Sequence, residues 1–171
     1  SATATLSNSW VTNNVANSDP GLPFSAGGGI YLSSSPSILY GNTVTTNTAQ
    51  YGGGICLFTS DATGSYNVIR GNSINNGGYG GGLYAENSSV VIDHNTIVTN
   101  SASAGNGGGL GLSGGLSAVM NNFIAGNTAL DPTAGGGGLY LIFVNATLAN
   151  NIIANNQVGG QGAGVYIGSA T

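Results

Sequence analysis

The chain repeats a glycine-rich segment at short, nearly constant intervals. Glycine triplets or close relatives begin at six positions, spaced 25, 28, 27, 29 and 26 residues apart: Gly27, Gly52, Gly80, Gly107, Gly136 and Gly162. Each is followed by an apolar, often aromatic, then apolar pattern, as in Ile30-Tyr31-Leu32. That period of two predicts a β-strand with its first and third side chains inward. Such a unit cannot bury its apolar face alone, so the repeats must stack as coils of a solenoid.

Asparagines mark two further positions of each repeat. The first lies eleven residues after the middle strand residue and holds Asn42, Asn95, Asn122 and Asn151. In the second repeat we assign Asn72 to this position, on the hypothesis of an insertion between Thr59 and Ser65. The second position follows five residues later, with Gly77 as the exception, and holds Asn47, Asn100, Asn127 and Asn156. Stacked amides can hydrogen-bond from coil to coil, which predicts asparagine ladders at the turns.

Apolar residues flank the first asparagine position on both sides. Three residues before it lie Leu39, Ile69, Ile92, Val119 and Leu148. Two residues after it lie Val44, Ile74, Ile97, Ile124 and Ile153. The pattern predicts an all-β solenoid of about six coils of about 27 residues, with three short strands per coil. Residues 1–171 then form one unit: a partial N-terminal coil (1–26), five full coils (27–161) and a partial C-terminal coil (162–171).

Three short sequence segments of the first full repeat resemble those of a known family. Gly-Gly-Gly-Ile-Tyr-Leu from Gly27, Asn42-Thr43-Val44 and Asn47-Thr48-Ala49 are similar to the right-handed parallel β-helix repeats of the pectate-lyase-like superfamily. They are closest to the non-catalytic repeats of bacterial surface and adhesin-like proteins. The resemblance covers nearly the whole chain and implies a right-handed β-helix at a cell surface.

Charge is nearly absent from the chain, which limits its partners. Lys and Arg together number 1 and Asp and Glu 5, so 4% of residues are charged, against about 25% in ordinary domains. One cation cannot neutralise the phosphates of a nucleic acid. The longest apolar stretch, 139–144, is far shorter than the roughly 20 residues of a membrane span. Cys56 is the single cysteine, which excludes a disulfide framework within the chain.

Candidate catalytic residues are few. Polysaccharide lyases and hydrolases on this scaffold need clustered carboxylates with Arg or Lys. The best candidates are Arg70, Asp93 and His94, and we expect Arg70 and Asp93 to stack on successive coils as an exposed ion pair. No second His accompanies His94, so we expect neither a metal site nor a cofactor. The chain is predicted not to be an enzyme.

Both ends of the chain resemble parts of a repeat. Leu6, Ser9, Val11 and Asn14 align with Leu39, Asn42, Val44 and Asn47, and the stretch from Gly162 resembles the front of a repeat. We therefore expect head-to-tail stacking, with an end-to-end interface that holds Leu6, Trp10, Val11, Val165, Tyr166 and Ile167. A truncated segment whose ends resemble its middle is the alternative. Because no leader precedes Ser1, the chain looks processed or excised, and we expect export.

Two surface features suggest contacts outside the coil. Tyr31, Tyr84, Tyr140 and Tyr166 share one outward position, which Cys56 and Gly111 interrupt. This column could stack on sugar rings, or it could pack against a neighbouring filament or a covering loop. Asn87 and Asn145 begin Asn-X-Ser/Thr glycosylation patterns. The function expected first is an extracellular structural protein that forms a fibre or filament. A surface adhesin or carbohydrate-binding module is the alternative, and a polysaccharide lyase-like enzyme is disfavoured.

Overall fold

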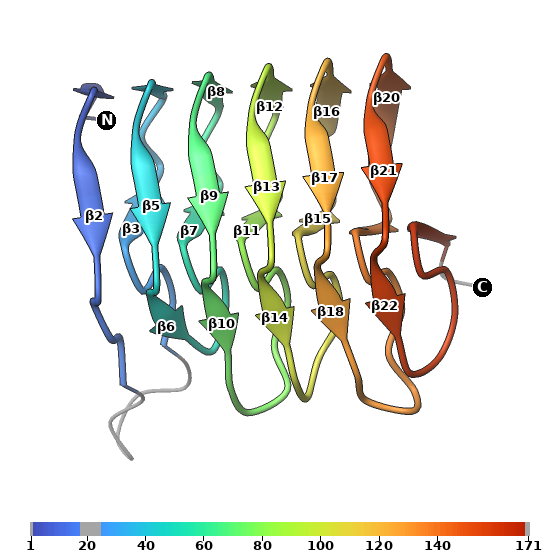
Figure 1. The fold of residues 1–171 in the computed structure, drawn as a ribbon. Helices are drawn as coiled ribbons and strands as arrows, with labels where there is room; N and C mark the ends of the chain where they lie inside the picture. The colour runs from blue at the N-terminus through green and yellow to red at the C-terminus, as the bar shows by residue number, and fades with distance from the viewer. Residues whose placement is uncertain (1, 18–24, 170–171) are drawn as a thin grey trace.

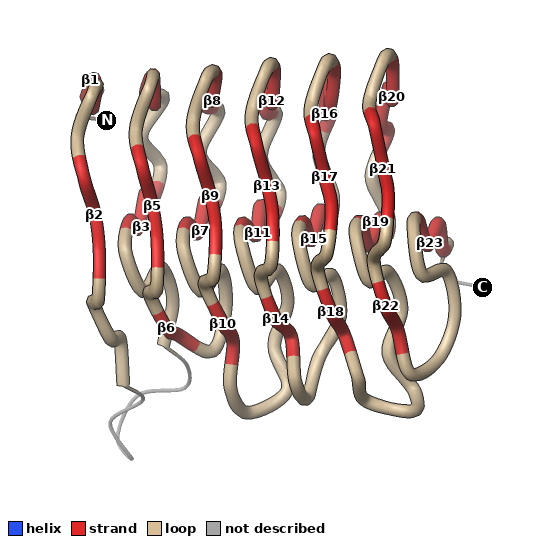
Figure 2. The backbone as a smooth tube through the Cα atoms, viewed as in Figure 1, coloured by secondary structure: helices blue, strands red, loops and turns tan. Residues whose placement is uncertain are grey.

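The computed structural model describes residues 2–17 and 25–169. Over these ranges the chain winds as a right-handed solenoid of parallel strands, with the N-terminal coil at one end of the stack and the C-terminal coil at the other (Figure 1). Strands and turns alternate around every coil, and no helix occurs in the described part (Figure 2). The β-solenoid predicted from the repeats is confirmed. Residues 1 and 18–24 of the predicted N-terminal partial coil and residues 170–171 of the C-terminal one lie outside the described ranges.

Four parallel sheets run along the length of the stack. The β3 sheet follows the glycine triplets and contains β3 (Ile30–Ser33), β7 (Ile55–Phe58), β11 (Leu83–Glu86), β15 (Leu110–Ser113), β19 (Leu139–Ile142) and β23 (Val165–Gly168). The β4 sheet contains β1 (Ala4–Ser7), β4 (Ser37–Tyr40), β8 (Ala62–Ser65), β12 (Val90–Asp93), β16 (Leu116–Met120) and β20 (Asn145–Ala149).

The other two sheets follow the two asparagine positions. The β5 sheet contains β2 (Trp10–Thr12), β5 (Thr43–Thr45), β9 (Val68–Arg70), β13 (Thr96–Val98), β17 (Phe123–Ala125) and β21 (Ile152–Ala154). The β6 sheet contains β6 (Thr48–Ala49), β10 (Ser73–Ile74), β14 (Ser101–Ala102), β18 (Thr128–Ala129) and β22 (Gln157–Val158).

Each complete coil therefore holds four strands, and the prediction of three was wrong. The two asparagine positions both bend the chain, so they divide the second half of a coil into three short strands. The coil count also differs slightly from the expected six. Between Ile30 of β3 and Val165 of β23 the chain makes five complete turns, while β1 and β2 belong to an incomplete turn before β3.

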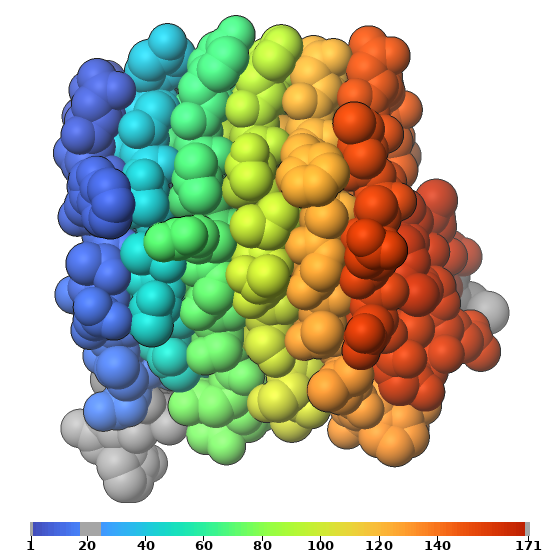
Figure 3. Space-filling view, in the orientation of Figure 1, coloured from blue at the N-terminus to red at the C-terminus, as the bar shows by residue number. Residues whose placement is uncertain are grey.

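The core is a set of stacked aliphatic columns inside the coil. Val44, Ile97, Ile124 and Leu110 are fully buried, and equivalent residues of successive coils pack directly on one another. Burying such a side chain contributes about 1.5–3 kcal/mol. The first and third residues of the β3-sheet strands from β3 to β19 pack into this core, as predicted. In Figure 3 successive coils lie side by side as continuous stripes.

The glycine triplets fit the turn before each β3-sheet strand. The first glycine of each triplet has a left-handed backbone, with φ of 57° at Gly52 and 70° at Gly80. In the five triplets before the last, the second and third glycines lie directly against the backbone of the next coil. A Cβ at Gly82 would lie 2.7 Å from the carbonyl oxygen of Gly109. Positive φ and close approach are the two conditions that favour glycine.

Candidate functional site

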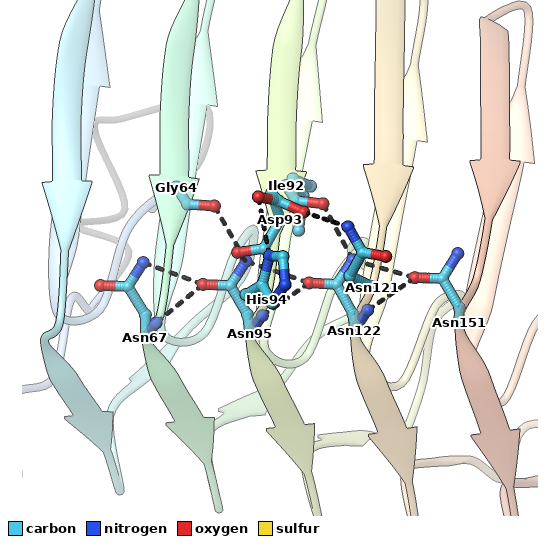
Figure 4. A network of polar contacts seen from close by, with 9 residues as sticks. All are labelled: Gly64, Asn67, Ile92, Asp93, His94, Asn95, Asn121, Asn122 and Asn151. Atoms are coloured by element: carbon cyan, nitrogen blue, oxygen red, sulfur yellow. Dashed lines mark hydrogen bonds and ion pairs between the residues drawn. The ribbon is translucent and has the colours of Figure 1, made fainter.

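The first asparagine ladder lies between the β4 and β5 sheets. Its members are Asn42, Asn67, Asn95, Asn122 and Asn151, and Figure 4 shows the last four in a row. The backbone N–H and the side-chain Nδ2 of Asn67 both donate to Oδ1 of Asn95, at 2.8 and 3.0 Å. The Nδ2 of Asn67 also donates to the Leu39 carbonyl oxygen on the preceding coil, at 2.9 Å. Each buried amide is thus bonded in both directions along the stack.

The second ladder lies between the β5 and β6 sheets. Its members are Asn14, Asn47, Asn72, Asn100, Asn127 and Asn156. Asn72 donates from its backbone and its side chain to Oδ1 of Asn100, both at 3.0 Å. The assignment of Asn72 to the first ladder was therefore wrong, as was that of Gly77 to the second. All the other asparagines predicted for the ladders occupy their expected ladder.

A glycine explains the misplaced register. Gly64 stands opposite Leu39 and Ile92, at an inward position where the other coils carry an aliphatic side chain. Because Gly64 lacks that apolar signal, the sequence pattern predicts Ile69 at the Leu39 position, whereas Ile69 pairs with Val44. Ile74 pairs with Ala49. The signal that could have found Asn67 was already present, since it lies eleven residues after Cys56, the spacing of the other ladder residues.

The ladders are directional, and their two ends differ. At the N-terminal end, Asn14 donates from its backbone and side chain to Asn47 Oδ1, at 2.9 and 3.0 Å. At the C-terminal end, Asn156 donates its Nδ2 to the Ile124 carbonyl oxygen, at 3.0 Å, and accepts from Asn127. Among the described residues nothing lies beyond Asn156 to receive its backbone N–H. The C-terminal end therefore presents donors, and Oδ1 of Asn14 presents an acceptor at the other.

A polar network lies on the surface beside the first ladder (Figure 4). Oδ1 of Asp93 accepts a hydrogen bond from Asn121 Nδ2 at 2.8 Å, and its Oδ2 lies 2.9 Å from Nδ1 of His94. The Asn121 bond and then the contact with His94 lower the pKa of Asp93. His94 also stacks on Tyr66, with ring centroids 5.0 Å apart.

The expected ion pair between Arg70 and Asp93 does not form. Arg70 lies at the end of β9 in the β5 sheet, beside Val98, whereas Asp93 ends β12 in the β4 sheet. The predicted ion pair is wrong for the same reason as the predicted ladder position of Asn72. The position of Arg70 is counted from Asn72, which belongs to the second ladder and not the first. The three candidate catalytic residues are therefore not gathered at one site.

The tyrosines predicted to share one outward position do pair in that register, but most of them are not exposed to solvent. Tyr31, Cys56, Tyr84, Gly111, Tyr140 and Tyr166 are successive partners in the β3 sheet. Tyr31 is 46% exposed, whereas Tyr84 and Tyr140 are only 4% and 8% exposed. Two tyrosines of the preceding turns cover them: Tyr51 lies 5.7 Å from Tyr84, and Tyr79 lies 5.4 Å from it, between ring centroids. Packing under a turn, one of the expected uses, accounts for this part of the column.

Cys56 stands in the tyrosine column between Tyr31 and Tyr84. It is 2% exposed, and burial, followed by the nearby Glu86 carboxylate, raises the pKa of its thiol to about 12. The thiol is therefore protonated at neutral pH, whereas the thiolate is the reactive form.

The residues expected to form an end-to-end interface lie at opposite ends of the stack. Leu6 and Val11, on β1 and β2, are half-buried against the core, while Trp10 is 74% exposed. Val165 packs against the core at the other end, and Ile167 is 74% exposed. Tyr166 stacks on Tyr140 at 5.1 Å between ring centroids. These strands are the outermost of their sheets in the described structure.

The two asparagines of the glycosylation patterns are accessible. Asn87 is an exposed residue of the turn after β11, with φ of 47°, and Asn145 is exposed at the start of β20. Glycosylation of either stays a prediction. Within 2–17 and 25–169 no helix is long and apolar enough to cross a membrane, and no group of three or more metal-ligating side chains occurs.

Comparison with known proteins identifies the fold family. No curated protein and no solved structure gives a significant match to the chain. The family described as "right handed beta helix region" matches residues 1–171, which is the full sequence. The four parallel sheets, to which each complete coil contributes one strand, and the two continuous asparagine ladders agree with that description. The chain belongs to the right-handed β-helix family.

Proposed function

We propose that this chain is a structural element of an extracellular or cell-surface fibre, whose coils continue head to tail. The observation that carries the proposal is the direction of the second asparagine ladder. Asn156 has donors that face away from the last coil, and Asn14 has an acceptor that faces away from the first. A second copy placed in line would set Asn14 beside Asn156 with the same bonds that join Asn127 to Asn156. The ladder then continues without interruption.

The apolar ends support the same arrangement. Leu6 and Val11 at one end, and Val165 at the other, pack on the core from one side only. The outermost strands of the sheets also carry hydrogen-bonding groups on one unpaired edge. Further coils, from the same polypeptide or from another copy, would bury these apolar residues and pair the strand edges. The contact is heterologous and does not close, so it generates a fibre.

Low charge supports close packing of copies. The formal net charge is −4 over 171 residues, so repulsion between stacked copies is weak. The charged side chains are also dispersed, with Arg70 and Asp93 in different sheets. In this proposal the chain acts through its shape and its ends and has no catalytic role. Because rings of the preceding turns cover Tyr84 and Tyr140, the tyrosine column is a poorer candidate for a sugar-binding platform.

Electron microscopy of the purified chain tests the proposal. We expect unbranched fibres with an axial repeat of six coils, or about 29 Å at about 4.8 Å per coil. The blocking variant is Thr12→Pro at the free edge of β2. Asn13 donates its N–H to Thr45, so the N–H of Thr12 faces away from β5, and its removal leaves the pairing with β5 intact.

The matched control is Thr12→Ala, which keeps the N–H. We expect Thr12→Pro to shorten the fibres or abolish them, while Thr12→Ala leaves them unchanged. Both variants should keep the circular dichroism spectrum of the native chain. Discrete rods one copy long in the native chain at all concentrations would contradict the proposal, as would fibres of unchanged length in Thr12→Pro.

A further inference from the structure

The tyrosine column of the β3 sheet has two gaps, and the two differ. Cys56 lies between Tyr31 and Tyr84, and Gly111 lies between Tyr84 and Tyr140. At each gap the flanking tyrosines are two coils apart, which is about 10 Å. That height admits one further ring, stacked between two partners.

The gap at Gly111 is filled from within the chain. Tyr79 comes from the turn on the coil before Gly111, and its ring stacks on Tyr84 and on Tyr140, at 5.4 and 5.6 Å between centroids. A Cβ at Gly111 would lie 3.2 Å from the Tyr84 ring and 3.3 Å from Cβ of Tyr79. Glycine is therefore the residue that leaves room for the inserted ring.

Among residues 2–17 and 25–169, none places a ring in the gap at Cys56. On the coil before Cys56, the residue at the turn position of Tyr79 is Ala26, whose methyl group cannot reach into the column. A cavity of about 370 Å³ remains here, bounded by Ala26, Tyr31, Tyr51, Cys56, Phe58, Tyr79, Tyr84 and Glu86. The cavity thus corresponds to the position that Tyr79 fills in the other gap, and no ring of the described residues occupies it.

The electrostatics of the open gap favour a cation. Glu86 borders it from β11, next to Phe58 in the same sheet. Burial, followed by the Glu86 carboxylate, raises the pKa of Tyr84, so this hydroxyl carries no competing negative charge at neutral pH. Arg70, the one Lys or Arg of the chain, lies in the β5 sheet and so away from this face. Ring faces and a carboxylate together attract positive charge.

We propose that the open gap between Tyr31 and Tyr84 binds a planar aromatic ring that carries a positive charge, such as an arylalkyl ammonium ion. The ring occupies the place that Tyr79 takes in the other gap. Its ammonium group lies against Glu86 and the surrounding ring faces. This inference is independent of the fibre proposal, because the gap lies on a side face and not at an end of the stack.

Titration with three probes that share one ring tests the charge requirement. The probes are tyramine (cation), 4-ethylphenol (neutral) and 3-(4-hydroxyphenyl)propionate (anion), followed by NMR chemical shifts of the tyrosine rings. We expect saturable tyramine binding at least tenfold tighter than that of 4-ethylphenol, and weaker binding still of the anion. Glu86→Gln should remove the preference for tyramine. Equal affinity for the three probes, or tighter binding of a methyl glucoside than of tyramine, would overturn the proposal.

Two variants test the position. Ala26→Tyr supplies from within the chain the ring that the gap lacks, and Ala26→Ser is its matched control with a small side chain. Ala26→Tyr should abolish tyramine binding and keep or raise the melting temperature, whereas Ala26→Ser should bind as the native chain does. Cys56→Tyr fills the gap from its floor and should give the same loss. Unchanged tyramine binding in a folded Ala26→Tyr or Cys56→Tyr variant would refute the site.

Discussion

Oδ1 of Asn95 accepts two hydrogen bonds from Asn67, one from the backbone N–H at 2.8 Å and one from Nδ2 at 3.0 Å. Asn95 in turn donates to Asn122 and to the Gly64 carbonyl oxygen. Asn95→Ala leaves the buried N–H and Nδ2 donors of Asn67 without their shared acceptor, and the Gly64 carbonyl oxygen without its Nδ2 donor. Each such group costs about 1–3 kcal/mol, so we expect the free energy of unfolding to fall by about 3 kcal/mol.

Urea denaturation measures the effect of Asn95→Ala. Asn75→Ala is the control, because Asn75 is an exposed turn residue outside both ladders. Its effect should stay within about 0.5 kcal/mol. Equal losses in the two variants would mean that the ladder contributes no more than an exposed asparagine does.

Replacing Gly64 by alanine should stabilise the chain. Gly64 stands where other coils carry Leu39 or Ile92, and it borders a small internal cavity with these two residues. A Cβ at Gly64 would meet only Nδ2 of Asn67, at 3.7 Å. Gly64→Ala therefore fits without strain and reduces the freedom of the unfolded chain. We expect a gain of about 0.4–1 kcal/mol in urea denaturation. A loss would show that the backbone at Gly64 needs glycine.

Most of the fold could be predicted from the sequence because the repeat is carried by residues with strong local preferences. The triplets that begin at Gly27 and Gly52 fix the length of each coil, and the strand after each shows a period of two. The predicted ladder register is wrong only in the coil containing Gly64, because the inward position there carries no side chain. The four strands per coil were also missed, because two-residue strands such as Thr48–Ala49 are too short to show a period.

The tyrosine cluster could be predicted only in part. The column of Tyr31, Tyr84 and Tyr140 follows from the repeat, but its covering rings come from turns of varying length. Two residues separate Ala49 from Gly52, whereas six separate Ala129 from Gly136. Where a turn changes length, the position of its side chains depends on packing and not on spacing. The open gap beside Cys56 is visible only when Tyr79 is seen to fill the other.

The hydroxyl group of Ser117 is expected to lower the free energy of unfolding. Its Oγ is buried without a hydrogen-bond partner in the described structure, on β16 between Val90 and Ala146. Ser117→Ala removes the unpaired hydroxyl, and we expect a gain of about 1 kcal/mol in urea denaturation. Ser37 is the control: it occupies the same column, and its Oγ lies 3.0 Å from Oγ of Ser35. Ser37→Ala should give no gain, and equal gains in both variants would contradict the explanation.

Asp93 should titrate below the usual range of a carboxyl group. Asn121 and then His94 lower its pKa. A carboxyl group whose folded pKa is lowered adds stability above its unfolded pKa, about 3.9, and loses it as the pH falls through the folded value. NMR titration of the Asp93 carboxyl carbon should show this low pKa. Asn121→Gly keeps the left-handed backbone at residue 121, φ 56°, and should raise the pKa. An unchanged pKa in Asn121→Gly would exclude the hydrogen bond as its main cause.

Gly82 and Gly164 hold the same place in their triplets but differ in what covers them. A Cβ at Gly82 would lie 2.7 Å from the Gly109 carbonyl oxygen and 2.9 Å from Nδ2 of Asn100. Gly82→Ala must therefore push two coils apart, and we expect a loss of about 3 kcal/mol in urea denaturation. At Gly164 a Cβ would meet only Cγ2 of Ile153, at 3.5 Å. Gly164→Ala should leave the stability of the single chain unchanged.

Gly164→Ala also tests the proposed head-to-tail assembly. If coils continue in line, the glycine turn of the next copy covers Gly164 as the turn at Gly109 covers Gly82. A methyl group at Gly164 would then block the contact while the coil that carries it stays folded. Gly164→Ala should shorten the fibres at an unchanged melting temperature. Fibres of native length in Gly164→Ala would mean that copies do not meet through this turn, and head-to-tail stacking in the register of the ladders would have to be abandoned.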